Sequence, residues 1–229
     1  MYTLHGVPDW GSQVVHMALA EMGVPFRFVA HDPKAGALAA PSFRALNPHG
    51  KVPVLETPDG TIHETAAILL YLVDRHCIIG PRAGEADRAR FLIWLVFIAN
   101  QLHPTVMTLI HPEDVAGEAL MRPVAEASAL RIRAQLAHLE ALAAEGGPWW
   151  MGAGQPSAVS LFTLMLMRWA AGYPAYADLA IGAAAFPALE RLARAIEARP
   201  VIARVLAAEG VEPTAFSAPR GRTGAQDAG

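Results

Sequence analysis

The first third of the chain alternates between strand-like and helix-like hydrophobic patterns. Short apolar runs at residues 2–5 and 26–30 predict strands, and residues 12–22 between them predict a helix whose apolar positions follow the i, i+3, i+4, i+7 spacing of one buried face. Gly23 then ends the helix, and residues 40–46 form a weaker helical pattern. The chain therefore opens with a βαβ unit followed by a short helix.

Residues 47–63, NPHGKVPVLETPDGTIH, combine a strand entered through a proline, a hairpin turn and the approach to a helix. Pro53 has no N–H, so it must lie at a sheet edge or in a bend. The peptide bond before it can be cis, which would turn the N–H and C=O of Val52 outward to pair with an extended ligand. Thr65 then starts a helix of residues 65–75, whose first N–H groups can bind a carboxylate. This segment predicts a binding site for a small acidic peptide.

Strand patterns nearly vanish beyond a break rich in Gly and Pro at residues 80–84. The second half predicts helices: residues 85–110, strained at Pro104, residues 117–145, an apolar and therefore central helix after Ser157, residues 189–196, and a short helix from Pro200. We therefore predict a domain of residues 1–79, a linker of residues 80–84, an all-helical domain of residues 85–209 and a loose tail of residues 210–229.

Composition narrows the function classes. The chain has 229 residues, 53% of them apolar, and a net charge of −3 without a basic patch, which argues against nucleic-acid binding. Cys77 is the one cysteine, so a disulfide framework and a CxxC site are excluded. No signal peptide and no run of 18 or more apolar residues is visible, so we predict a cytoplasmic protein without membrane contact.

The order of these elements resembles the soluble, cytosolic glutathione S-transferase family over about residues 1–209. The most specific motifs are NPHGKVPVLE and DGTIHETAAILLYL, and a box from Pro156 to Ser160 resembles the helix-starting motif of the second domain. The resemblance implies an α/β N-terminal thioredoxin-like domain of βαβαββα order with a mixed sheet, followed by an all-α C-terminal helical domain. The family usually has Asp where Ser160 stands, so we expect a weaker cap, because serine cannot return the capping interaction as a carboxylate would.

The resemblance also implies that glutathione is the ligand and co-substrate and that no metal is needed. Val52 would pair through its backbone with the cysteinyl unit, Thr65 and its helix start would take the γ-glutamyl carboxylate, and Glu64 would meet the ammonium group. The residues just before the proline would supply positive charge or hydrogen-bond donors for the glycine end of glutathione. The implied glutathione-binding residues are Lys51, Val52, Pro53, Glu64, Thr65 and His49.

The thiol-activating position departs from the family pattern. The turn after the first strand resembles most closely that of the bacterial beta class, but the cysteine position of that class falls on Gly11. Ser12 is the nearest hydroxyl and the first catalytic candidate, with hydrogen bonding to its own backbone as the alternative. The indole N–H of Trp10 is a second candidate. Asp9 would oppose a thiolate unless it points away as a helix N-cap.

In the second domain, the resemblance implies that His103 faces the active site, although Pro104 stands where the family has a basic residue. His103 and Met107 are the candidates for the pocket of an electrophile, and Phe97 and Ile110 on the same long helix could extend it. An apolar stripe of this kind is also typical of plain core.

The resemblance thus implies a glutathione S-transferase, active in detoxification as a homodimer, that joins the glutathione thiolate to a small apolar electrophile. The alternative is a non-catalytic binding or protein-interaction module of the same fold. A thiol reductase would need a cysteine in the first turn, and none is present there.

Overall fold

The N-terminal domain is built on a four-stranded mixed sheet with the order β2-β1-β3-β4. The computed structural model describes residues 1–144 and 147–220. The central β1 pairs in parallel with β2 and antiparallel with β3, which pairs antiparallel with β4. The strands are β1 (Tyr2–Gly6), β2 (Phe26–Ala30), β3 (Val54–Thr57) and β4 (Gly60–His63).

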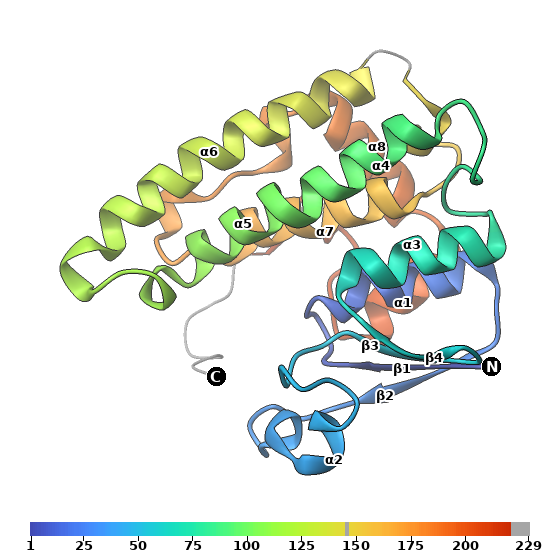
Figure 1. The fold of residues 1–229 in the computed structure, drawn as a ribbon. Helices are drawn as coiled ribbons and strands as arrows, with labels where there is room; N and C mark the ends of the chain where they lie inside the picture. Colours follow the sequence, from blue (N-terminus) through green and yellow to red (C-terminus); the bar gives the residue numbers. More distant parts are fainter. Residues whose placement is uncertain (145–146, 221–229) are drawn as a thin grey trace.

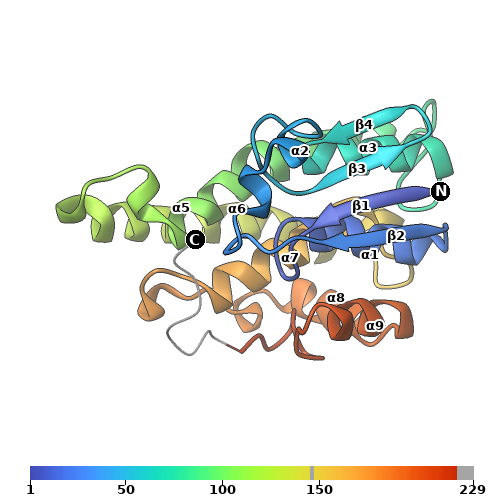
Figure 2. The same ribbon diagram turned by 90° about the horizontal axis from the view of Figure 1, so that it is seen from below.

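Helices cover the sheet on both faces (Figures 1 and 2). α1 (Ser12–Met22) and α3 (Thr65–His76) lie between the sheet and the helical domain, where they contact α7. α2 (Pro41–Arg44) lies on the opposite face, next to the 3-10 turn Ala37–Ala39. The predicted βαβαββα order and mixed sheet are confirmed, with α1 and β2 at the predicted bounds.

The C-terminal domain is helical throughout its described part. Its helices are α4 (Arg88–Phe97), α5 (His103–Ile110), α6 (Glu118–Ala144), α7 (Ala158–Gly172), α8 (Pro187–Glu197) and α9 (Pro200–Ala208). α7 is buried along almost its whole length, because its sequence is apolar on every side. The predicted central position of this helix is confirmed.

The predicted helix of residues 85–110 begins at Arg88 and changes its winding in the middle. A π-helical turn, Ile98–Leu102, joins α4 to α5 just before Pro104. Proline cannot donate to the preceding turn, so carbonyl groups lose their usual partners there. The Thr105 hydroxyl donates to the Gln101 carbonyl oxygen at 2.7 Å instead. The segment Arg88–Ile110 is long and apolar enough to cross a membrane by length and composition alone, a test that core helices of soluble proteins also pass.

The other long helix begins at Glu118, one residue later than predicted, and is described to Ala144. Glu145, the predicted last residue, lies outside the described residues. The linker and domain boundaries stay predictions.

The cap of α7 corrects one expectation. Ser157 accepts a hydrogen bond from the Ser160 N–H at 3.0 Å, and the Ser160 hydroxyl oxygen accepts one from the Ser157 N–H at 2.8 Å. Both side chains are fully buried, so the short serine side chain reaches the N-cap N–H without competition from water. Ser160 therefore does complete the capping box, contrary to the prediction.

The segment of residues 211–217 also corrects the sequence analysis, which placed it in a loose tail. Phe216 is fully buried in the main core. The Glu197 carboxylate on α8 accepts hydrogen bonds from the N–H groups of Phe216 and Ser217 at 3.1 Å each. Small and polar composition suggested looseness, but a buried carboxylate and one aromatic side chain hold the segment. Residues 221–229 of the predicted tail lie outside the described residues.

Candidate functional site

The loop before β3 presents the backbone of Val52. The peptide bond between Val52 and Pro53 is cis, as anticipated, and β3 begins only at Val54, so Val52 lies ahead of the strand ladder. Asn47 holds this loop: its Nδ2 donates to the Lys51 carbonyl oxygen at 2.7 Å and its Oδ1 accepts from the His49 N–H at 3.1 Å. Sequence reasoning missed Asn47, although an Asn before Pro-His-Gly is typical of such side-chain turns.

The start of α3 lies directly after β4. Glu64, the N-cap residue, has a φ of 73°, a left-handed conformation that costs a non-glycine residue free energy and is often found at functional sites. Its side chain is 75% exposed, while Thr65 is buried and begins the helix. The first N–H groups of α3 have no intrahelical partner, so this end is suited to an anion.

Lys51 and His49 are both exposed beside the same loop. The His49 ring packs edge-on against His63 of β4, with 5.8 Å between ring centroids. Lys51 and His49 thus lie in the same loop as Val52, and their contact with the glycine end of a peptide stays a prediction.

The turn between β1 and α1 meets the Val52 loop at Gly11. A Cβ atom at Gly11 would lie 3.8 Å from both the Val52 carbonyl oxygen and Pro53 Cδ, and 3.9 Å from Trp169 Cη2. Gly11, the N-cap residue of α1, therefore lies beside the Val52 backbone. The Gln13 N–H in the first turn of α1 already donates to the Trp10 carbonyl oxygen at 2.9 Å, which leaves the N–H groups of Gly11 and Ser12 for a ligand. Trp10, beside it, is partly exposed. Trp169 on α7 was not singled out from sequence, because it lies in a helix that is apolar on every side.

Ser12 is fully buried and is engaged by its own turn. Its Oγ donates to the Val7 carbonyl oxygen at 3.0 Å and accepts from the Val7 N–H at 3.2 Å. Gly6 makes room for it, because a Cβ atom there would lie 2.4 Å from Ser12 Oγ. This is the backbone-bonded arrangement that the sequence analysis held as the alternative to catalysis.

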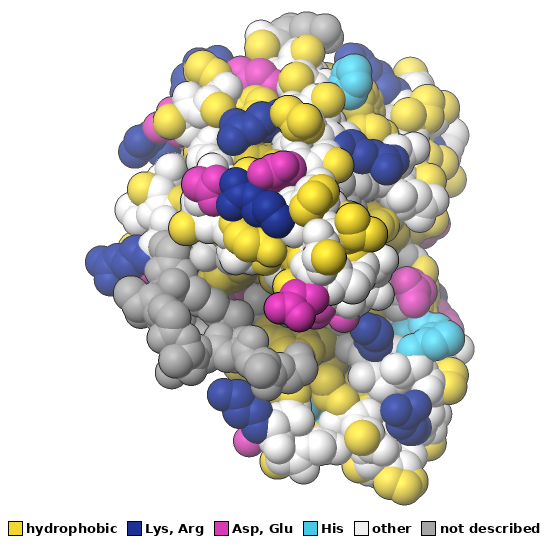
Figure 3. Space-filling model, turned by 90° about the vertical axis from the view of Figure 1, so that its left-hand side faces the viewer, with side chains coloured by type: hydrophobic (Ala, Val, Ile, Leu, Met, Phe, Trp, Pro, Cys, Tyr) yellow, Lys and Arg dark blue, Asp and Glu magenta, His cyan; other side chains and the backbone are white. Residues whose placement is uncertain are grey.

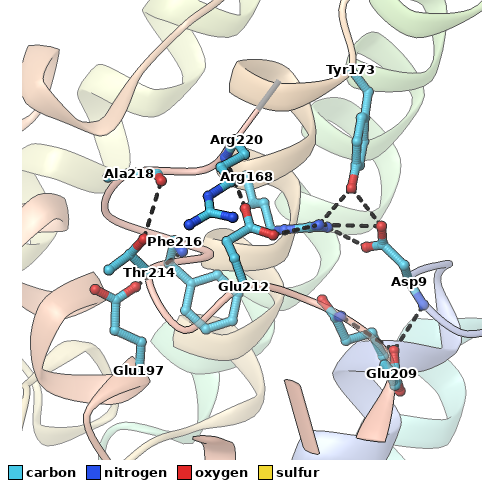
Figure 4. A network of polar contacts seen from close by, with 11 residues as sticks. Asp9, Arg168, Tyr173, Glu197, Glu209, Glu212, Thr214, Phe216, Ala218 and Arg220 are labelled. Atoms are coloured by element: carbon cyan, nitrogen blue, oxygen red, sulfur yellow. Dashed lines mark hydrogen bonds and ion pairs between the residues drawn. The ribbon is translucent and has the colours of Figure 1, made fainter. Parts of the chain in front are cut away.

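The Asp9 side chain points toward Arg168 of α7 (Figure 4). It does not cap α1, whose N-cap is Gly11, but receives two hydrogen bonds from the Arg168 guanidinium and one from the Tyr173 hydroxyl. Burial lowers the pKa of Arg168, but the hydrogen bonds and charge of Asp9 outweigh it and hold the pKa above its ordinary value. The carboxylate is thereby paired with a permanent cation.

His103, the first residue of α5, lies against two aromatic side chains of α7. Its ring centroid is 5.6 Å from that of Phe162 and 5.9 Å from that of Trp169. Burial among these rings lowers the pKa of His103 to about 4, against a smaller raising effect of the Glu64 carboxylate. His103 is therefore neutral at pH 7 and lies within electrostatic reach of the start of α3.

Met107 lies one turn further along α5 and is partly buried. Phe97 is oriented differently: it packs edge-on against Trp94 and against His138 of α6. Phe97 is thus engaged on the α6 side of its helix, whereas His103 faces α7.

The surface between the two domains is hollowed, with hydrophobic side chains in the hollow and charged and histidine side chains along its edges (Figure 3). Within residues 1–144 and 147–220, no group of three or more His, Cys, Asp or Glu side chains could hold a metal ion. The site thus consists of backbone groups, helix starts and aromatic walls.

Comparison with known proteins gives one consistent result. The family model for the glutathione S-transferase N-terminal domain matches residues 1–74. The GST-like protein YncG of Escherichia coli (strain K12) is 33% identical over 125 residues, which are 52% of this chain and 59% of that protein. Glutathione S-transferase GST-4.5 of Xanthomonas campestris is 26% identical over 170 residues, 73% of this chain and 81% of that protein. The matches to the first curated relatives span 59%, 53% and 41% of their lengths.

Solved structures cover more of the chain. A sphingomonad glutathione S-transferase in complex with glutathione is 30% identical, with a TM-score of 0.72, over 92% of this chain and 100% of that one. The glutathione S-transferase of Xylella fastidiosa, at 24% identity and a TM-score of 0.77 over 93% of this chain, shares the fold. From the similarity along the whole length of the sphingomonad enzyme, we conclude that this chain belongs to the glutathione S-transferase family.

Proposed function

We propose that this chain binds glutathione and transfers its thiolate to a small apolar electrophile. The observation that carries the proposal is the meeting of the Val52 backbone with the start of α1 at Gly11, next to the free start of α3. A 30% identical relative has been solved with glutathione. The Val52 backbone ahead of β3 and two helix starts offer hydrogen-bonding groups that suit a short peptide with a carboxylate at each end.

In this proposal each part of glutathione has a partner. The Val52 N–H and C=O pair with the cysteinyl unit beside Pro53, and Thr65 with the first N–H groups of α3 takes the γ-glutamyl carboxylate. The exposed Glu64 carboxylate meets the γ-glutamyl ammonium group. Lys51 and His49, both exposed beside the loop, serve the glycine carboxylate.

The thiol would then lie near the start of α1. A free thiol with a pKa of about 8.5 is mostly protonated at pH 7, so the site must favour the thiolate. We infer that the N–H groups of Gly11 and Ser12 at the start of α1 supply this stabilisation, because Ser12 Oγ is bonded to Val7 and the Asp9 carboxylate is bonded to Arg168. Ser12 itself and the indole N–H of Trp10 are the side-chain alternatives.

In the reaction, the thiolate sulfur donates an electron pair to an electrophilic carbon and a C–S bond forms. A leaving group departs with its electron pair, or the electrons of a double bond shift and are then protonated. Neutral His103, Met107 and the Trp169 ring would wall the apolar side of the site. These groups favour an apolar electrophile over a charged one.

The second candidate is a glutathione-binding module without turnover. It is favoured by Gly11 and Asp9, which stand where family members have activating residues. Retention on immobilised glutathione together with turnover of a general aromatic electrophile supports the transferase, whereas retention without turnover supports the module. A cytoplasmic location, a role in detoxification and a place nearest the bacterial beta class remain part of the proposal.

Replacing Thr65 by Ala should weaken glutathione binding by about 1–3 kcal/mol, because a buried hydrogen bond to a carboxylate would be lost. Titration calorimetry measures the effect. Thr61→Ala on exposed β4 is the control and should bind as the wild type does. An unchanged affinity of Thr65→Ala contradicts the assignment of this residue.

Ser12→Ala should lower the free energy of unfolding by about 1 kcal/mol, because the bonds to Val7 are lost, and should leave the pKa of the bound glutathione thiol unchanged. The ultraviolet absorbance of the thiolate, followed against pH, measures that pKa. The pKa of the bound thiol is measured in the same way for Trp10→Phe. A rise of the thiol pKa in either variant identifies that side chain as the activating group and overturns the backbone proposal.

His103 should make the fold less stable in acid. Its pKa of about 4 lies below the ordinary 6.5, so between these values the unfolded chain binds more protons and the free energy of unfolding falls as the pH falls. His103→Gln should reduce the loss of stability between about pH 7.5 and about pH 5, on the order of 1 kcal/mol, in urea unfolding. His138→Gln, with an exposed side chain on α6, is the control. An equal effect of both variants contradicts the assignment to His103.

We further propose that the chain forms a homodimer through the outer face of α4. Ile93 and Val96 are 65% and 50% exposed on this apolar helix and border a shallow hollow with Phe97. Sedimentation should show a dimer for the wild type and a monomer for Ile93→Glu. Leu130→Glu, an equally drastic change at a 71% exposed leucine of α6, should leave the dimer intact. A monomeric wild type refutes the interface.

A further inference from the structure

The Asp9 carboxylate joins the turn after β1 to the helical domain. Asp9 has a φ of 66°, so the backbone adopts an unfavourable left-handed conformation at the residue whose side chain reaches α7. Arg168 Nη1 and Nη2 donate to its two carboxylate oxygens, and the Tyr173 hydroxyl donates to Oδ2 (Figure 4). A bidentate contact of this kind fixes both distance and orientation.

Arg168 is committed to this contact. Its side chain is only 3% exposed, and Glu212 from the C-terminal segment lies 3.8 Å away on its other side. A guanidinium this deeply buried has high desolvation cost, so a loss of its carboxylate partner is strongly unfavourable. The pair is thus a rigid connection between the two domains.

The backbone of the same turn is held from a second side. Glu209, just after α9, accepts hydrogen bonds from the Asp9 N–H at 2.9 Å, from Gln13 Nε2 at 3.2 Å and from His16 Nδ1 at 2.7 Å. The turn is therefore fixed between the end of α9 and the C-terminal half of α7.

These contacts also fix the position of Gly11 in the same turn. Trp169 follows Arg168 in α7 and lies against the Cβ position of Gly11, so one helix both binds Asp9 and borders the start of α1. We propose that Asp9 and Arg168 are positioning residues, which hold the N–H groups at the start of α1 in the geometry that favours the thiolate of the bound peptide. The inference rests on the glutathione function proposed above.

The competing explanation is that the Asp9–Arg168 ion pair only stabilises the fold. A second ion pair between the two domains serves as a control that distinguishes the two explanations. Glu21 near the end of α1 receives two hydrogen bonds from Arg199 at 2.8 and 2.9 Å, again between the two domains. Because α1 rises about 1.5 Å per residue, Glu21 lies roughly 13 Å along the helix from Ser12. It cannot adjust the start of α1 directly.

Asp9→Asn is the decisive variant, because the loss of the negative charge and the loss of positioning change the thiol pKa in opposite directions. Removing a negative charge near the site favours the thiolate and lowers the thiol pKa. Loss of positioning raises the thiol pKa and should reduce kcat/KM by about 10- to 100-fold, with the dissociation constant of glutathione changed by less than about 3-fold. Arg168→Lys keeps the charge without the bidentate contact and should act in the same direction, which provides a second test if Asp9→Asn does not fold.

The test uses the full chain and compares Asp9→Asn, Arg168→Lys and the control Glu21→Gln. Thiolate absorbance against pH and steady-state kinetics should change in the first two variants only, while urea unfolding records the stability lost in each. An unchanged or lowered thiol pKa in Asp9→Asn, or the same rise in Glu21→Gln, overturns the proposal.

Hydrogen exchange without any ligand separates this inference from the proposed function. The amides of residues 10–13 should exchange about 10-fold faster in Asp9→Asn than in the wild type or in Glu21→Gln. If the wild type neither binds glutathione nor lowers the pKa of the glutathione thiol, the glutathione function fails. Unchanged hydrogen exchange in Asp9→Asn would show, independently of that result, that the contact between Asp9 and Arg168 does not hold the turn.

Discussion

The buried guanidinium of Arg168 is the constraint on which the arrangement of the two domains around the site depends. An apolar contact between domains tolerates sliding, because the hydrophobic effect has no preferred direction. A guanidinium that is 3% exposed and bound to both oxygens of Asp9 resists sliding, since displacement would separate a buried charge from the carboxylate that binds it at two points. The turn after β1 therefore takes its position from a helix 159 residues away in the chain.

This constraint also explains why a carboxylate is tolerated beside a proposed thiolate site. About two units of pKa lowering correspond to about 2.7 kcal/mol, an amount that an uncompensated negative charge nearby would reduce. Pairing with Arg168 offsets the charge of Asp9, and burial keeps His103 uncharged at pH 7. In the proposed site, helix N–H groups and their dipole supply the stabilisation, typically about 0.3–2 kcal/mol from the dipole and about 1.5–3 kcal/mol from a hydrogen bond to a charged group.

Local patterns predicted most of the fold from sequence. The helix of residues 12–22, the cis bond before Pro53 and the order of strands all depend on near neighbours in the chain, and each was confirmed. The contacts that were missed join distant segments. Phe216 was assigned to a loose tail because nothing near it suggests a core, yet Glu197 on another helix binds its backbone. Ser160 was expected to give a weaker cap because serine cannot return the capping interaction as a carboxylate would, and only the buried geometry shows that it completes the box.

The candidate site shows the same difference between features set by near neighbours and contacts between distant segments. Val52, Thr65 and Glu64 could be proposed as ligand-binding residues because a proline, a strand end and a helix start are visible in nearly consecutive residues. The contact of Asp9 with Arg168 could not be predicted, because the two residues lie 159 positions apart in the chain. Sequence reasoning could therefore propose a ligand-facing surface, but not the contacts that hold this surface in place.

The absence of a side chain at Gly11 determines whether a protein thiol can take part in the chemistry at this position. A side chain there would meet the Val52 carbonyl, Pro53 and Trp169 at ordinary contact distances, so the position has room for a β-carbon but is surrounded on several sides. A cysteine sulfur at this place would stand where the proposed ligand thiol approaches and would favour disulfide exchange. Glycine leaves that volume to the ligand and offers only its backbone. A mixed disulfide between the protein and a bound thiol therefore cannot form at this position.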